Sequence, residues 1–245
     1  MTTAHALFAD LRRNQLLAAL PAAQWPHWRA LLEPVELQRG QVLCESGRTP
    51  AYVYFPVTAV VSLLVLTLEG EATEVAVVGH DGVVGISLFM GGSAMPSQAV
   101  VQAEGTAYRL RAAALMGEVE HGGAVLEMLL RYTQALMAQV AQTALCIRYH
   151  SISQQFSRRL LQGLDRAPCD DLQMTQESAA QLLGVRREGV TAAALKLQRS
   201  GVISYRRGHI AVLDRSALER HTCTCYGAAK REYQRLMPMA MPLAA

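Results

Sequence analysis

The chain has 245 residues, 51% hydrophobic and 18% charged, a composition that excludes an intrinsically disordered protein. Its apolar runs are shorter than the roughly 18 residues of a transmembrane helix, and its first ten residues lack the pattern of a secretory signal. We therefore expect no membrane contact and a cytoplasmic location, and five irregularly spaced cysteines agree with a reducing compartment.

The net charge of +3 hides an uneven distribution along the chain. Residues 1–145 carry 8 Lys and Arg against 12 Asp and Glu, whereas residues 146–245 carry 15 against 8. A basic second half indicates a surface that faces an anion. Nucleic acid is the first candidate, and an acidic protein or lipid surface would also fit.

The first half of the chain has the pattern of a small β protein with helices at its entry. Residues 7–20 and 24–32 have helical spacing around Pro21, and short apolar runs separated by glycine-containing turns then follow. The expected strands are residues 42–44, 52–55, 60–68, 75–78, 83–88, 99–101 and 107–110. They predict an antiparallel, jelly-roll-like β-roll, a shape that often encloses one ligand.

A helical period replaces the strand pattern after residue 123. Steps of 3 and 4 residues, without Gly or Pro, connect Leu126, Leu129, Thr133, Leu136, Val140, Thr143 and Ile147. Such a seam predicts a long helix that pairs with the same helix of a second chain. The alternative is a long helix packed on its own roll.

The second half contains the pattern of a helix-turn-helix. An amphipathic helix at residues 151–164 and an expected linker at 166–170 precede it. Thr175 is a good N-cap for a helix that runs to residue 183, although Ser178 is not the Glu or Gln of a capping box. Gly184 allows the left-handed turn into a second helix.

The second helix and the following hairpin carry the groups that suit DNA. The residues at the exposed start of this helix are Arg186, Arg187, Glu188 and Thr191. Arginine can pair with guanine and glutamate can accept from cytosine, so we expect Arg187 and Glu188 to read bases. Residues 202–205 and 209–213 predict a wing. The residues expected to hold phosphates are Thr175, Gln176, Arg206 and Arg207.

From residue 7 to residue 213 the chain resembles the Crp/Fnr superfamily of bacterial transcription regulators. Arg187 and Glu188 match the family's Arg/Glu pair, and Thr191 stands where Ser or Gly is common. The family's turn glycines are matched by Gly40, Gly47, Gly70, Gly82 and Gly85. The resemblance implies a homodimer, joined by the long helix, that binds a palindromic site in double-stranded DNA. RNA polymerase is a further candidate partner.

The roll departs from the cyclic-nucleotide-binding members of this superfamily at two positions. Their Gly-Glu pair is Gly85 and Ile86 here, and the Arg that precedes their Ser or Thr is Pro96, before Ser97. Without that carboxylate and guanidinium we expect no cyclic AMP in the usual mode, and the small-molecule effector is unknown. The residues that would line the corresponding pocket are Gly85, Ile86, Ser87, Ser97, Gln98 and Thr133.

The sequence predicts no metal, no cofactor and no enzyme. His221, Cys223 and Cys225 alternate within five residues, but zinc sites usually use cysteine pairs separated by two to four residues. Iron–sulfur relatives have cysteines near the N-terminus, whereas this chain has none before Cys44. No nucleophile elbow, Walker loop, dinucleotide fingerprint or zinc-protease motif is present.

The fold class that follows is α+β, in three parts. We expect a sensor roll at residues 1–122, a dimerisation helix and hinge at 123–166, and a winged helix-turn-helix with a C-terminal tail at 167–245. The leading hypothesis is a homodimeric DNA-binding transcription regulator. The second is a receptor that switches DNA binding on a cyclic nucleotide or dinucleotide, and the third is a scaffold protein with a degenerate helix-turn-helix.

Overall fold

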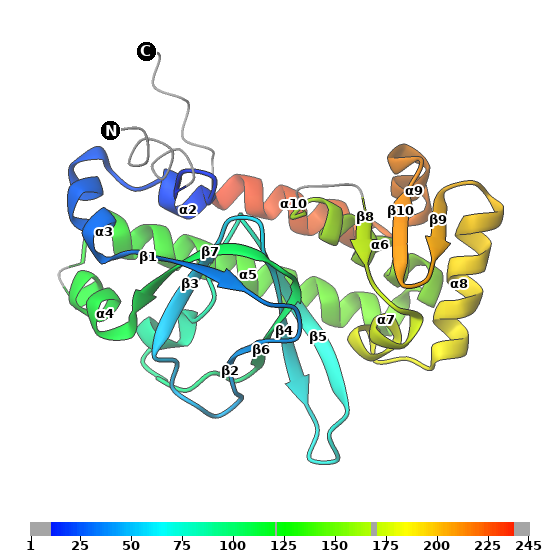
Figure 1. The fold of residues 1–245 in the computed structure, drawn as a ribbon, viewed down its shortest axis with the longest axis horizontal. Helices are drawn as coiled ribbons and strands as arrows, with labels where there is room; N and C mark the ends of the chain where they lie inside the picture. The colour runs from blue at the N-terminus through cyan, green and yellow to red at the C-terminus, as the bar shows by residue number, and fades with distance from the viewer. Residues whose placement is uncertain (1–10, 121, 168–170, 238–245) are drawn as a thin grey trace, which may run out of the picture.

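A computed structural model of the chain describes residues 11–120, 122–167 and 171–237. Residues 7–10 of the expected first helix and residues 168–170 of the expected linker lie outside them. The fold is α+β: a β-roll and a helix-turn-helix with a small sheet lie toward opposite ends of one long helix (Figure 1). Within the described residues, no helix is long and apolar enough to cross a membrane.

The roll consists of two antiparallel sheets, with strand orders β1-β7-β3 and β2-β6-β4-β5. Side chains alternate along Tyr52–Pro56, so that Val53 and Phe55 enter the core while Tyr52 and Tyr54 lie closer to the surface. The strands are β1 Glu33–Leu37, β2 Val42–Cys44, β3 Tyr52–Pro56, β4 Val60–Leu66, β5 Ala72–Val78, β6 Gln98–Ala103 and β7 Gly105–Arg111.

Residues 83–88, an expected strand, do not form one. Val84 makes only an isolated bridge with Tyr54, and the 3-10 helix η2, Ile86–Met90, follows Gly85. Gly85 has a φ of 108°, and a Cβ there would lie 2.9 Å from Cγ1 of Val53. The positive φ and the close approach of β3 therefore end the extended conformation. The opening helices are also shorter than expected: α2 Gln15–Ala18, η1 Ala22–Gln24 and α3 Trp25–Leu31.

The expected long helix is present as α5, Ala124–Tyr149, after the short helix α4, Ala112–Glu120. The inward side of α5 packs on the roll and, toward its end, against residues 155–159. It buries four positions of the predicted seam in the protomer: Leu129, Thr133, Leu136 and Thr143. Each threonine hydroxyl donates to the carbonyl four residues earlier. These four side chains are buried within the protomer, so the exposed part of the predicted seam lies at its other positions.

A second core lies at the other end of α5, around α6, Ile152–Leu164. The helices α7, Gln176–Leu183, and α8, Arg187–Arg199, pack on α6 beside a sheet of order β8-β10-β9. The remaining elements are β8 Asp171–Gln173, β9 Ile203–Arg206, β10 His209–Val212, α9 Arg215–His221 and α10 Thr224–Leu236. Strands β1 and β8 and helices α4, α9 and α10 were not predicted from the sequence. Helix α10 lies along α5 and adds Leu236 to the core of the roll (Figure 1).

Two ion pairs join the roll to α6 and the residues after it. Glu74 of β5 and Arg159 of α6 are both buried, with Oε1 and Nε 2.6 Å apart, and the Ser62 hydroxyl also donates to Glu74. Arg166 forms a bidentate pair with Asp81, at 2.6 and 3.0 Å. Because both partners of the first pair are buried, removing one would leave an uncompensated charge.

We predict that Arg159→Ala lowers the free energy of unfolding by about 3–5 kcal/mol, since it leaves the Glu74 carboxylate buried without its cation. Urea denaturation followed by circular dichroism measures this loss. The matched control is Arg235→Ala, which breaks an exposed pair with Glu232 and should leave the midpoint unchanged. Equal midpoints for Arg159→Ala and the wild type would contradict the structural role of the buried pair.

Candidate nucleic-acid interface

Thr175 fixes the start of α7. Its hydroxyl accepts from the Ser178 backbone N–H at 3.0 Å, and the Ser178 hydroxyl accepts from the Thr175 backbone N–H, also at 3.0 Å. This is a reciprocal capping box, so the expectation that Ser178 would not complete one is wrong: a serine hydroxyl is long enough here. Thr175 is exposed, so the N-terminus of α7, which is the positive end of the helix dipole, faces solvent.

Gly184 makes the turn between α7 and α8. It has a φ of 64°, in the left-handed region that was predicted for it from the sequence. The chain then enters α8 through Arg186, which is the N-cap residue without a side-chain capping bond. Arg186, Arg187 and Glu188 are all exposed. The start of α8 lies near the start of α7, because Nε of Arg187 is 4.0 Å from a carboxylate oxygen of Glu177.

The wing is a tight hairpin between β9 and β10. Arg207 and Gly208 have φ values of 48° and 84°, and positive φ at both positions is the feature of a type I′ turn. Arg206 and Arg207 are exposed. The Met174 backbone N–H donates to the Gly208 carbonyl at 2.7 Å, so the wing tip lies directly beside the residue that precedes the α7 cap.

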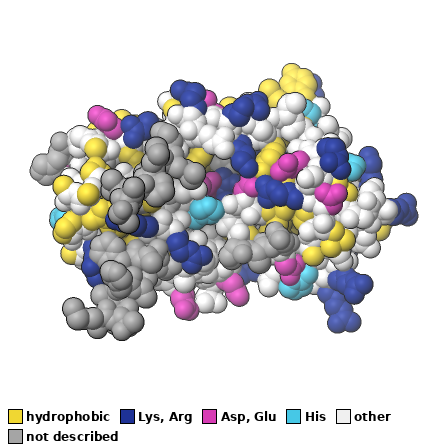
Figure 2. Space-filling view, turned by 90° about the horizontal axis from the view of Figure 1, so that it is seen from above, with side chains coloured by type: hydrophobic (Ala, Val, Ile, Leu, Met, Phe, Trp, Pro, Cys, Tyr) yellow, Lys and Arg dark blue, Asp and Glu magenta, His cyan; other side chains and the backbone are white. Residues whose placement is uncertain are grey.

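Besides the Arg187–Glu177 pair, a hydrogen bond of Thr191 joins the start of α7 to the start of α8. The Thr191 hydroxyl donates to Oε1 of Gln176 at 2.7 Å, and it also lies 3.0 Å from the Arg187 carbonyl. Thr191 is therefore half-buried, unlike the exposed arginines that precede it on α8. The helix starts and the wing tip form one basic face, which we call the helix-turn-helix face, and Figure 2 shows Lys and Arg side chains projecting at this end of the molecule.

All eight residues of the predicted DNA-binding set lie on or beside the helix-turn-helix face. Two further residues of this face were missing from the predicted set: Ser178, which completes the cap, and Glu177, which lies beside Arg187. A serine three residues after a threonine N-cap and an acidic residue in the first turn are local signals that could have identified both. The face can bind a polyanion through exposed guanidinium groups and through helix N-termini.

The six predicted effector residues come from three separate segments of the chain: residues 85–87, residues 97–98 and helix α5. Ser87, Ser97 and Thr133 are buried, and the Gln98 amide donates to Glu45 at 2.7 Å. The buried Ser87 hydroxyl has no hydrogen-bond partner among the described residues.

A cavity of about 400 Å³ lies elsewhere, between α5, α6 and α10. Its lining includes Asp81, Arg166, Tyr226 and Tyr233, and it contains none of the six predicted effector residues. Burial raises the pKa of the Tyr233 phenol, whose hydroxyl donates to the Asp81 carbonyl at 2.6 Å. The cavity is therefore separate from the position at which the resemblance places an effector.

Solved structures of bacterial regulators share the fold. FixK2 from Bradyrhizobium japonicum has a TM-score of 0.67 at 17% identity, covering 78% of this chain and 98% of its own. A CRP-family transcriptional regulator from Thermus thermophilus has a TM-score of 0.64 at 20% identity, covering 76% and 95%. The c-di-GMP-responsive global regulator CLP from Xanthomonas campestris has a TM-score of 0.63 at 14% identity, covering 79% and 100%.

No curated protein sequence matches this chain. Two family models do match, and they identify its two parts. The cyclic nucleotide-binding domain model matches residues 34–121, and the Crp-like helix-turn-helix domain model matches residues 154–221. The first match contains the roll and the second contains α7, α8 and the wing, in the order that the structure shows. With both family domains in place and the shared fold around them, the chain belongs to the Crp/Fnr family of transcription regulators, which are not enzymes.

Proposed function

We propose that the protein regulates transcription as a homodimer that binds a palindromic DNA site through its helix-turn-helix face. The observation that carries the proposal is the convergence of two helix starts and the wing tip, with exposed arginines on α8 and the wing. The division into a sensor roll at 1–122, a dimerisation helix and hinge at 123–166, and a DNA-binding part at 167–245 belongs to the same proposal. The alternative, a scaffold protein that does not bind DNA, would not explain why exposed arginines gather where the two helix starts and the wing tip meet.

Different contacts on this face have different roles in the proposal. Arg187 and Glu188, in the first turn of α8, extend away from the core and would reach base edges in the major groove. The exposed residues of the wing and the capped start of α7 would lie over the phosphate backbone. Thr191 would position Gln176 through their mutual hydrogen bond rather than read a base.

We predict that Arg187→Ala and Arg206→Ala weaken DNA binding in different ways. Arg187→Ala should cost about 1–3 kcal/mol and relax the preference at one base pair of each half-site. Arg206→Ala should weaken binding to all sequences alike and reduce the salt slope by about one unit. Selection from random duplexes supplies the site, and fluorescence anisotropy over a salt series measures both variants.

The control for these variants is Arg48→Ala, which removes an exposed arginine from a turn of the roll. It should bind the selected site as the wild type does. Direct base reading by α8 is contradicted if no palindrome is enriched, or if Arg187→Ala selects the same motif as the wild type.

The dimer contact that we propose uses the exposed face of α5. Leu130, Met137, Val140, Ala144 and Ile147 are exposed in the protomer and are separated by 7, 3, 4 and 3 residues. That spacing is a heptad pattern on one side of the helix, and apolar side chains in such a stripe gain stability when a second copy covers them. Val140 and Ile147 belong to the seam expected from the sequence.

We predict that Met137→Glu combined with Val140→Glu converts a dimer into monomers, because charges would replace apolar groups in the proposed contact. Sedimentation velocity measures the change. Leu68→Glu is the control, since Leu68 is a fully exposed leucine of the roll and should leave the dimer intact. A wild-type protein that sediments as a monomer at micromolar concentration would contradict the proposed contact.

The effector mode that we propose differs from that of the cyclic-AMP-binding relatives. Ile86 and Pro96 stand where those relatives have the ribose-binding carboxylate and the phosphate-binding guanidinium. A hydrogen bond to a charged group contributes about 1.5–3 kcal/mol, so losing both contacts removes most of the usual affinity. The unpaired buried hydroxyl of Ser87 supports a polar ligand at this position of the roll.

We predict that calorimetric titration with cyclic AMP at moderate salt detects no binding in the low-micromolar range. The same titration with c-di-GMP, the molecule to which the Xanthomonas regulator responds, tests the second hypothesis. The comparison variant is Ser87→Ala, which should weaken any cyclic nucleotide bound in the roll. A low-micromolar dissociation constant for cyclic AMP would show that other residues replace the two missing contacts.

A further inference from the structure

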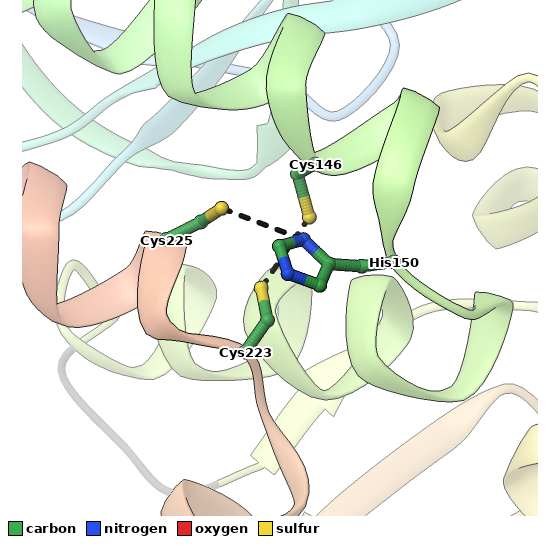
Figure 3. A group of neighbouring side chains, drawn as sticks. All are labelled: Cys146, His150, Cys223 and Cys225. Carbon is green, nitrogen blue, oxygen red and sulfur yellow. Dashed lines mark hydrogen bonds between the residues drawn. The ribbon is translucent and has the colours of Figure 1, made fainter.

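The structure assembles three cysteines and one histidine at the junction between α5, α6 and α10. They come from two segments far apart in the sequence: the end of α5 and the start of α10 (Figure 3). The members of this cysteine–histidine cluster are Cys146, His150, Cys223 and Cys225. His221, which stands close to Cys223 and Cys225 in the sequence, is not a member of the cluster.

Local structure explains how each segment presents its pair of ligands. Cys146 lies in the last turn of α5, and His150 is the C-cap residue four positions later, which places both on one side of the helix. Cys223 is the N-cap residue of α10, and Cys225 follows in the first turn of that helix. The His150 carbonyl accepts a hydrogen bond from the Gln155 amide at 2.9 Å, which holds the α5–α6 connection in place.

The distances within the cluster match a tetrahedral metal site. The Sγ atoms of Cys146 and Cys223 are 3.5 Å apart, Sγ of Cys225 is 3.6 Å from Nδ1 of His150, and all four ligand atoms lie within 4.8 Å of one another. Zinc with Zn–S of about 2.3 Å and Zn–N of about 2.0–2.1 Å separates its ligands by about 3.8 Å (S–S) and about 3.6 Å (S–N). An ion at the centre therefore needs little movement of the side chains.

We propose that the cysteine–histidine cluster binds one zinc ion per chain, which fastens α10 to the end of the long helix. Three soft sulfurs and one imidazole form a closed Cys₃His set of the kind that zinc occupies in structural sites. All three cysteines are buried, and the cluster has no carboxylate member that would favour a harder ion. Binding would release the thiol protons to solvent, without any change of oxidation state.

The three thiols of the cluster differ in their surroundings: the hydrogen bond with Cys223 and burial raise the pKa of Cys146, and burial raises the pKa of Cys225. A hydrogen bond from the Cys146 thiol, above all, lowers the pKa of Cys223 to about 5. The buried Arg158 guanidinium adds a positive charge that opposes the raised pKa values of Cys146 and Cys225. Arg158 is held by the Thr143 hydroxyl at 2.6 Å. Three thiolates on a divalent ion leave one excess negative charge, which this guanidinium would balance.

A disulfide is the competing use of the same cysteines. The four cysteines among the described residues are free, and the 3.5 Å between the sulfurs of Cys146 and Cys223 is well beyond the roughly 2.05 Å of a disulfide bond. A Cys146–Cys223 disulfide would also leave Cys225 and His150 without a shared role. The metal site uses all four groups.

The decisive measurement is the metal content of the full-length wild-type protein, purified under reducing conditions and analysed by plasma mass spectrometry. We expect about one zinc ion per chain. Cobalt titration of the metal-depleted protein should produce the visible absorption of tetrahedral cobalt with thiolate ligands. Cys225→Ser should lose the zinc and weaken the cobalt absorption, whereas Cys44→Ser, which removes a buried thiol of β2 outside the cluster, should retain both.

A chelator should lower the melting temperature of the wild type and of Cys44→Ser, but not that of Cys225→Ser. Wild-type protein without zinc and without cobalt–thiolate absorption would overturn the proposal, even if the variants fail to fold. A Cys146–Cys223 disulfide found by mass spectrometry in anaerobically purified protein would also overturn it, in favour of a redox pair.

Discussion

The buried ion pair between Glu74 and Arg159 is the interaction on which the relation between the two halves depends. An isolated charge in either position would be costly, so the carboxylate of β5 and the guanidinium of α6 each require the other. The Ser62 hydroxyl satisfies a further lone pair of the carboxylate. Seven residues further along both segments, Asp81 and Arg166 form the second pair. Together the two pairs hold α6, on which the helix-turn-helix packs, against the roll.

The helix-turn-helix contacts the roll at Thr73, the residue before Glu74 of the first pair. A Cβ on Gly184 would lie 2.6 Å from the Thr73 hydroxyl, and Leu64 and Ala72 of the roll join the second core. The turn that joins α7 to α8 is therefore part of a packed junction as well as a helix-turn-helix motif. Any change that separates the roll from α6 would have to expose a buried charge pair and this apolar contact together.

Local signals in the sequence predicted most elements correctly. The N-cap at Thr175, the left-handed turn at Gly184 and the wing turn each depend on residues within a few positions of one another. Residues 83–88 were misassigned because a short apolar run has the same pattern in a strand as in a buried segment that makes one isolated bridge and then a 3-10 helix. The buried and exposed faces of α5 could not be distinguished from the sequence, because both carry leucines: Leu129 is buried and its neighbour Leu130 is exposed.

Contacts between distant segments were beyond sequence reasoning, and α10 shows why. Its start meets the end of α5 at the cysteine–histidine cluster, and Tyr226 donates to Asp165 at 2.8 Å. Further along, Tyr233 reaches the turn that holds Asp81. Each of these contacts joins residues more than 60 positions apart, so spacing along the chain gives no indication of them. Because its partners lie on the roll, on α5 and on α6, α10 spans the junction that the two ion pairs define. A ligand that fastened or released α10 would thus act on the same joint that orients the helix-turn-helix.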